Sequence, residues 1–177
     1  MASSGKSKSI CVHWFRKGLR LKDNPALLAA VEEQDGKFFE LRPIFVLDPW
    51  FVSNGKVGEN RWRFLVQSLQ DLDRQLKALG TRLFVMKGSP PDVFRSIFQK
   101  WNVEKITFES DTEPYSITRD AEITKIAQEF GIHVVSKLSH TLYDPNQVLK
   151  ANKGITPTVS NYILGILTQR HDLQFIL

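Results

Sequence analysis

The chain has 177 residues, 42% of them hydrophobic and 24% charged, which is the composition of a globular domain with a substantial core. Its formal net charge of +5 is a mild basic excess that is compatible with a polyanionic partner without requiring one. Cys11 is the only cysteine, which excludes a disulfide framework and fits a reducing compartment. The polar residues 1–9 lack the apolar core of a signal peptide, and no apolar run is long enough to span a bilayer. We therefore expect a location in the nucleus or cytoplasm and no membrane partner.

Short apolar runs alternate with longer segments of helical periodicity along the chain. After a lead at residues 1–9 that we expect to be disordered, the apolar runs predict strands at 10–15, 41–47, 82–86, 105–109 and 132–136. Most of these runs are nearly continuous in apolar residues, as expected for parallel strands buried on both faces.

Four helices are predicted between the strands. The first begins at Pro25 with Asn24 or Asp23 as its cap. The second ends near Gly80, and its apolar residues fall three and four apart at Trp62, Leu65, Leu69, Leu72, Leu76 and Leu79. The third begins at Ser89-Pro90 and carries Val93, Phe94, Ile97, Phe98 and Trp101, and the fourth runs from about residue 116 to 130.

This alternation predicts a doubly wound, Rossmann-like α/β domain whose parallel sheet has helices on both faces. Ligands in such sheets bind beyond the carboxyl ends of the strands. None of the five strand ends carries a G-x-G-x-x-G or Walker loop, which argues against a dinucleotide or triphosphate site of the usual kind.

Few groups at the strand ends could carry chemistry. Glu109, Asp111 and Glu113 could act as paired acid–base carboxylates, but we favour helix capping or pairing with nearby cations. His13 and His133 are predicted to be buried, hydrogen-bonded core residues. The histidine and cysteine spacing fits no zinc site, and no Ser/His/Asp set can be placed, so we expect neither a metal site nor a catalytic residue.

The first strand runs directly into a dense basic segment with Arg16, Lys17, Arg20 and Lys22. Its length exceeds the two to six residues usual for such connections. The segment could bind a phosphate, line a ligand cleft or dock another domain, or it could be a solvated loop whose cations pair with carboxylates such as Asp23. The residue types alone leave these alternatives open.

Several stretches resemble the photolyase/cryptochrome family over residues 10 to about 150. They are "VHWFRKGLRLKDNPAL", "RPIFVLDPW", "RWRFL", "DLDRQLKALGTRLFVMKGSP", "ITFESDTEPYSITRD" and "SHTLYDP". The form "EPYSITRD" is similar to that of animal (6-4) photolyases. The resemblance implies an amino-terminal α/β domain with strand order 3-2-1-4-5 that holds an antenna chromophore, a deazaflavin or a folate.

The resemblance also implies the residues of the antenna site. Arg61 and Asp111 match the polar antenna contacts, Phe45 and Leu47 match an apolar wall, and Trp14 and Phe15 are adjacent candidates. The resemblance makes the basic segment with Arg16, Lys17 and Arg20 an interface, whose cations we expect to meet partners outside this chain.

The rest of the implied machinery is expected to be missing. Residues 151–177 resemble the family only faintly and are interpreted as a diverged linker or an alternative tail. The helical domain that binds FAD in the family is expected to be absent, so light-driven DNA repair by this chain alone is not expected. DNA contact would be weak, and the exposed interface, with apolar tail residues such as Ile163 and Leu167, would favour self-association or a protein partner. The alternative is a cryptochrome-like interaction module in light or clock signalling.

Overall fold

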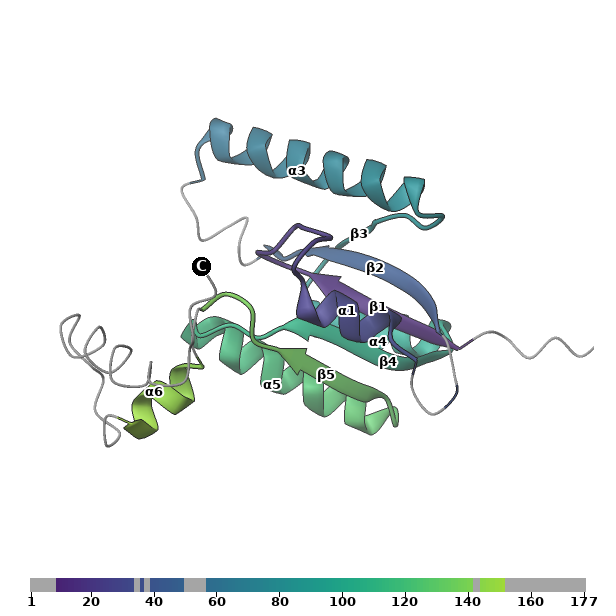
Figure 1. The fold of residues 1–177 in the computed structure, drawn as a ribbon. Coiled ribbons are helices and arrows are strands. Elements are labelled where there is room, and N and C mark those ends of the chain that lie inside the picture. Colours follow the sequence, from purple (N-terminus) through teal and green to yellow (C-terminus); the bar gives the residue numbers. More distant parts are fainter. Residues whose placement is uncertain (1–8, 34–35, 37–38, 50–56, 142–143, 152–177) are drawn as a thin grey trace, which may run out of the picture. The chain divides into compact units, whose positions relative to one another are not determined.

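The computed structural model describes residues 9–33, 36, 39–49, 57–141 and 144–151. Its strands are β1 (Ile10–Phe15), β2 (Glu40–Leu47), β3 (Phe84–Lys87), β4 (Val103–Glu109) and β5 (His133–Lys137). They form one sheet in the order β3-β2-β1-β4-β5, and every neighbouring pair is parallel (Figure 1). The predicted doubly wound class and strand order are confirmed.

The described helices are α1 (Pro25–Val31), α3 (Glu59–Ala78), α4 (Pro90–Lys100), α5 (Pro114–Glu129) and α6 (Pro145–Ala151). The chain divides into two compact units after His140, and α6 belongs to the second. At the start of α6, the side chain of Asp144 accepts a 2.8 Å hydrogen bond from the Asn146 backbone N–H. The apolar tail predicted to favour association lies outside the described residues.

The helix starts follow local capping chemistry. Asn24, and not Asp23, caps α1, because its side-chain oxygen accepts a 2.9 Å hydrogen bond from the Leu27 N–H. Asp23 has a φ of 51°, so it turns the chain into the helix just ahead of the cap. Proline occupies the first turn of α1, α4 and α5, where a missing N–H costs no helical hydrogen bond.

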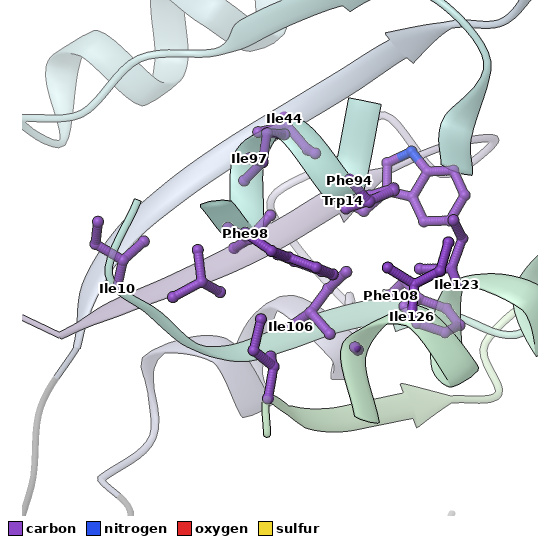
Figure 2. Packing of buried hydrophobic residues seen from close by; sticks show 14 of the residues in the cluster. Ile10, Trp14, Ile44, Phe94, Ile97, Phe98, Ile106, Phe108, Ile123 and Ile126 are labelled. Carbon is purple, nitrogen blue, oxygen red and sulfur yellow. The ribbon is translucent and has the colours of Figure 1, made fainter. Parts of the chain in front are cut away.

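One face of the sheet packs against α4 and α5 around Trp14 (Figure 2). The Trp14 ring centroid lies 4.9 Å from that of Phe94 on α4 and 5.8 Å from that of Phe108 on β4, both edge-on. Ile123 and Ile126 of α5 complete this cluster, and both are buried. Burial of these side chains supplies the main hydrophobic stabilisation of the domain.

The opposite face packs against α1 and α3, because side chains alternate along β1. Phe15 lies there with Leu27 of α1 and with Leu72 and Leu76 of α3. His13 is also buried on this strand, and its Nδ1 lies 2.7 Å from Thr107 Oγ1. Burial, together with the charge of Arg16, lowers the pKa of His13 to about 3 and keeps it neutral, which confirms the predicted core histidine.

The predicted end of α3 near Gly80 is confirmed, and Leu79, at the cap position, is 72% exposed. Two predictions about single elements are wrong. His133 is exposed, because it opens the edge strand β5. The third strand begins at Phe84 and not at residue 82, since the Leu83 N–H donates to Asp73 Oδ1 at 3.0 Å and not to a neighbouring strand.

Candidate functional site

A cleft of about 460 Å³ opens at the carboxyl ends of β1, β2 and β4. Its described lining comes from the segment after β1, the end of β2, the first half of α3 and the segment that leads from β4 into α5. The chain order reverses at β1, which pairs with β2 on one side and β4 on the other. The cleft therefore occupies the position where doubly wound sheets bind ligands.

The cleft brings together the residues that the family resemblance singled out. All six predicted antenna contacts line it, namely Trp14, Phe15, Phe45, Leu47, Arg61 and Asp111. Trp14 and Phe15 are buried in the core, whereas Arg61 is exposed on α3. Of the predicted interface residues, Arg16 and Lys17 line the cleft, and Arg20 lies outside its described lining. The roles of these residues as antenna contacts or interface residues stay predictions.

Asp111 is held by four donors. Its Oδ1 accepts the backbone N–H groups of Thr112 at 2.8 Å and Glu113 at 3.2 Å, and its Oδ2 accepts Ser116 Oγ at 3.1 Å and Lys17 Nζ at 2.8 Å. Burial raises the pKa of Asp111, but the hydrogen bonds from Lys17 and the Glu113 N–H outweigh it and bring the pKa to about 2. Glu113 Oε1 also lies 2.8 Å from Lys17 Nζ, so the structure shows cation pairing for Asp111 and Glu113. Neither carboxylate caps α5, since the helix has no side-chain cap hydrogen bond and the two backbone donors to Asp111 precede its first residue.

Arg16 and Arg119, which both line the cleft, share one carboxylate, that of Asp120. Arg16 Nη1 lies 2.5 Å from Asp120 Oδ1, and Arg119 Nη2 lies 3.1 Å from the same oxygen. The two guanidinium carbons lie 4.9 Å and 4.8 Å from the centroid of the Trp14 ring. Burial lowers the pKa of Arg16, although its hydrogen bond to Asp120 acts in the opposite direction. Arg16 of the basic segment and Arg119 of α5 therefore place two partly desolvated cations beside the Trp14 ring.

Tyr115 closes a link across the cleft from α5 to the end of β2. Its hydroxyl donates a hydrogen bond to Asp48 Oδ2. Burial and the negative charge of Asp48 raise the pKa of Tyr115 to about 12, so the phenol keeps its proton. The Arg119 guanidinium lies 5.5 Å from the Tyr115 ring centroid.

Glu109 is a buried carboxylate at the end of β4, and its side chain is only 4% exposed. Ser139 Oγ donates to its Oε1, His140 Nε2 lies 3.6 Å from its Oε2, and Arg20 Nη2 lies 4.0 Å from its Oε1. Gly18 passes so close that a β-carbon at this position would lie 2.2 Å from Glu109 Oε2. Glu109 thus ties the segment after β1 to the segment after β5.

The basic segment has carboxylate partners within the chain, which is one of the alternatives that the residue types left open, while the interface that the family resemblance implies stays a prediction. Arg16 pairs with Asp120, Lys17 with Asp111 and Glu113, and Arg20 with Asp23 and Glu109. The sequence reasoning missed Asp120, Arg119 and Tyr115. Asp120 lies 104 positions after Arg16, and no local sequence pattern predicts an ion pair at that separation.

A larger open groove of about 1170 Å³ lies between α1 and the end of α3, near the start of β2. It is remote from the strand ends that gather the charged groups, so we place the candidate site in the smaller cleft. Within the described ranges, no set of His, Cys, Asp and Glu side chains could hold a metal ion. The described helices include none long and apolar enough to cross a membrane.

The family model described as DNA photolyase matches residues 11–172. The chain belongs to the DNA photolyase family. It is similar to Cryptochrome-1 of Rattus norvegicus, with 49% identity over 163 residues that make up 92% of this chain and 27% of that protein. Cryptochrome-2 of Gallus gallus is 45% identical over 170 residues, which are 95% of this chain and 28% of that protein. The chain thus spans just over a quarter of the length of these curated relatives.

Solved structures of photolyases and cryptochromes have the same fold. The archaeal photolyase from Sulfolobus tokodaii, solved with two FAD molecules, has a TM-score of 0.68 and 34% identity over 76% of this chain and 30% of that chain. The Synechocystis cryptochrome has a TM-score of 0.82 at 22% identity over 95% of this chain and 35% of that chain, which shows the fold alone. The sheet is that of the amino-terminal α/β domain of this family. A specific kinship with (6-4) photolyases stays a prediction.

The close approach of Gly18 to Glu109 gives a first prediction. Gly18→Ala should lower the free energy of unfolding by about 1–3 kcal/mol, because the added methyl group must displace a buried carboxylate held by Ser139. Urea denaturation measures the change. Gly58→Ala is the matched control, since a β-carbon there meets nothing within 4 Å, and we expect less than about 1 kcal/mol. Equal losses in the two variants would contradict the packing of Gly18 described above.

The second prediction concerns the pH dependence of stability. The pKa of Asp111 lies below its ordinary value of 3.8, so the ionised carboxylate stabilises the fold above pH 3.8 and this stabilisation is lost as the pH falls towards 2. Because Lys17 is 51% exposed, we expect about 1–2 kcal/mol at neutral pH. Asp111→Asn should therefore be less stable than wild type at pH 7, with a gap that closes near pH 2.

Denaturation curves between pH 7 and pH 2 measure this gap. Asp71→Asn, on the exposed face of α3, is the control and should follow the wild-type profile. A gap between wild type and Asp111→Asn that stays constant down to pH 2 would show that the ionised carboxylate is not what stabilises the fold.

Proposed function

We propose that this α/β domain binds an antenna chromophore in the cleft at the strand ends, as part of a photolyase/cryptochrome-type flavoprotein. The observation that carries the proposal is the gathering of the four family-matched residues and the two adjacent candidates around one cleft of about 460 Å³. A volume of this size is within the usual range for small-molecule and cofactor sites. The proposal assigns light absorption to the domain and places no catalytic residue in it.

The lining suits a flat, conjugated ring system with polar edges. Phe45 and Leu47 from β2 and Phe64 and Leu65 from α3 supply apolar surface. Arg61 stands on the same helix face, and Asp111 and Glu113 stand across the cleft. Arg61 would oppose a phenolate or carboxylate of the ligand, and a ring N–H would seek a carboxylate acceptor. A deazaflavin, a folate or a flavin meets these requirements.

The hydrogen bonds that Asp111 already accepts determine how a ligand would bind to it. Its two oxygens already accept four donors, which fills the acceptor capacity of a carboxylate. Lys17 is the most exposed of these donors and has Glu113 as a second partner. We propose that a ligand N–H displaces Lys17 from Asp111 while Lys17 stays bound to Glu113. Ligand binding would then retain the three hydrogen bonds that Asp111 accepts from two backbone N–H groups and Ser116.

The solved relative supports the class of ligand. In the Sulfolobus tokodaii photolyase, the presence of two FAD molecules implies a novel light-harvesting cofactor. By analogy, a second flavin-type ring in this chain would absorb light and pass the energy to a catalytic flavin. We propose that the photoreaction needs that catalytic FAD and that the α/β domain alone repairs no lesion. DNA contact would be weak, because carboxylates already neutralise Arg16 and Lys17.

Titration of a deazaflavin and of a folate into the 177-residue chain tests this proposal. Chromophore fluorescence should report one saturable site, and Arg61→Ala should weaken binding about tenfold or more, because a charged hydrogen bond is lost. Arg63→Ala is the matched control on the same helix, where Arg63 Nη2 bonds Glu59 Oε1 at 2.9 Å. It should bind like wild type.

Two results would overturn the proposal. One is equal affinity of wild type and Arg61→Ala for whichever chromophore binds. The other is the absence of saturable binding of both chromophores to a folded wild-type chain, with folding verified by circular dichroism.

A further inference from the structure

Two guanidinium groups that line the cleft, those of Arg16 and Arg119, contact a single carboxylate beside it, that of Asp120. Asp120 Oδ1 receives Arg16 Nη1 at 2.5 Å, Arg119 Nη2 at 3.1 Å and Arg119 Nε at 3.3 Å. The side chains of Arg16, Arg119 and Asp120 are 8%, 15% and 15% exposed, so solvent screens these charges only in part. A well-formed arginine–carboxylate pair uses two nitrogens and two oxygens, whereas here three N–H groups converge on one oxygen.

This sharing leaves Arg16 incompletely bonded. Its Nη2 atom is buried and has no hydrogen-bond partner among the described residues. A buried donor without an acceptor carries the full cost of its lost hydration. A charged acceptor for Arg16 Nη2 within the same ion pair is the second carboxylate oxygen of Asp120. Asp120 is, however, also hydrogen-bonded to Arg119.

The neighbouring acidic side chains of the cleft already have partners. Asp111 and Glu113 bind Lys17, and Asp48 accepts the hydroxyl of Tyr115. Asp120 is the only carboxylate that contacts Arg119 in the described part of the chain. Arg119 lines the cleft, so a ligand can reach it from solvent.

From this arrangement we infer that the cleft contains an oxyanion subsite at Arg119, which takes a phosphate or carboxylate group of a small ligand. An oxyanion on Arg119 removes Arg119 from Asp120, and Asp120 then turns both oxygens to Arg16. The ligand thereby supplies the second negative charge that the two guanidinium groups lack. Asp120 is in this account a competitor of the ligand and a positioning residue for Arg16.

The anion subsite can be tested by itself with a simple anion. Only the identity of the complete ligand rests on the proposed function, in which the cleft binds a chromophore. A phosphate would come from a nucleotide-type flavin, and a carboxylate from a folate tail. Inorganic phosphate and glutarate represent the two chemistries as probes. Each is titrated calorimetrically into the full chain at constant ionic strength.

Asp120→Asn is the informative variant, because competition and simple structural support predict opposite results. Removal of the competing charge should tighten binding of the preferred anion about tenfold, whereas loss of a merely structural residue would weaken it or leave it unchanged. The variant should melt at a lower temperature than wild type without anion and gain more from added anion. Arg119→Gln should weaken binding at least tenfold, because it removes the cation that the anion contacts.

Arg95→Gln is the matched control. Arg95 lies on α4, its Nη1 bonds Glu129 Oε2 at 2.9 Å, and it stands outside the described cleft lining. Its anion affinity should equal that of wild type. Arg119→Lys keeps the positive charge, so this variant should fold and should bind the anion with an affinity between those of wild type and Arg119→Gln.

The inference is overturned if Arg119→Gln binds phosphate and glutarate as tightly as wild type does. It is also overturned if Asp120→Asn binds neither anion more tightly than wild type does. Absence of binding of both anions, in the millimolar range, to wild type and all variants would overturn it as well. Chromophore binding without anion binding would refute this subsite and leave the proposed function standing. Anion binding with the expected variant pattern, but without chromophore binding, would support the subsite and refute the proposed function.

Discussion

The arrangement of the site depends on the reversal of strand order at β1. The chain leaves β1 for β2 and β3 on one side of the sheet and later returns to β4 and β5 on the other side. The connections after β1 and after β4 therefore leave adjacent strand ends, and helices cover opposite faces. A crevice at this point follows from the topology, and the residues at 14–19 and 111–119 meet there because of it.

Charge pairing gives this crevice its particular chemistry. The dense basic segment after β1 is stable because carboxylates from three other places face it: Glu109 at the end of β4, Asp111 after it and Asp120 on α5. Each of these pairs joins segments that are far apart in the sequence. The pairs differ in their completeness, since Asp111 has a full set of donors while Arg16 lacks one acceptor. The incomplete pair is where an added anion would have the largest effect.

The sequence predicted the fold well because its signals are local. Nearly continuous apolar runs marked the strands, and proline after a capping residue marked helix starts at Pro25 and Pro90. The exceptions also have local causes that the pattern does not reveal. His133 is exposed because β5 is an edge strand, and Leu83 stays out of the sheet because Asp73 takes its N–H.

The residues of the candidate site were harder to predict from the sequence than the fold. Arg61 and Asp111 were named only through the family resemblance, because nothing in an isolated arginine or aspartate indicates a ligand. The contacts of Asp120, Tyr115 and Gly18 depend on tertiary packing across many positions, so no pattern along the chain could announce them. Conversely, residue types alone favoured capping or cation pairing for Asp111, and the structure shows the cation pairing, with Lys17.

A structure of the chain with a bound deazaflavin tests the central claim most directly. The account predicts the ring against Phe45 and Leu47, a ring edge within hydrogen-bonding distance of Asp111, and Lys17 held by Glu113 alone. A chromophore seated in the open groove between α1 and α3, with Lys17 still bound to Asp111, would contradict the account.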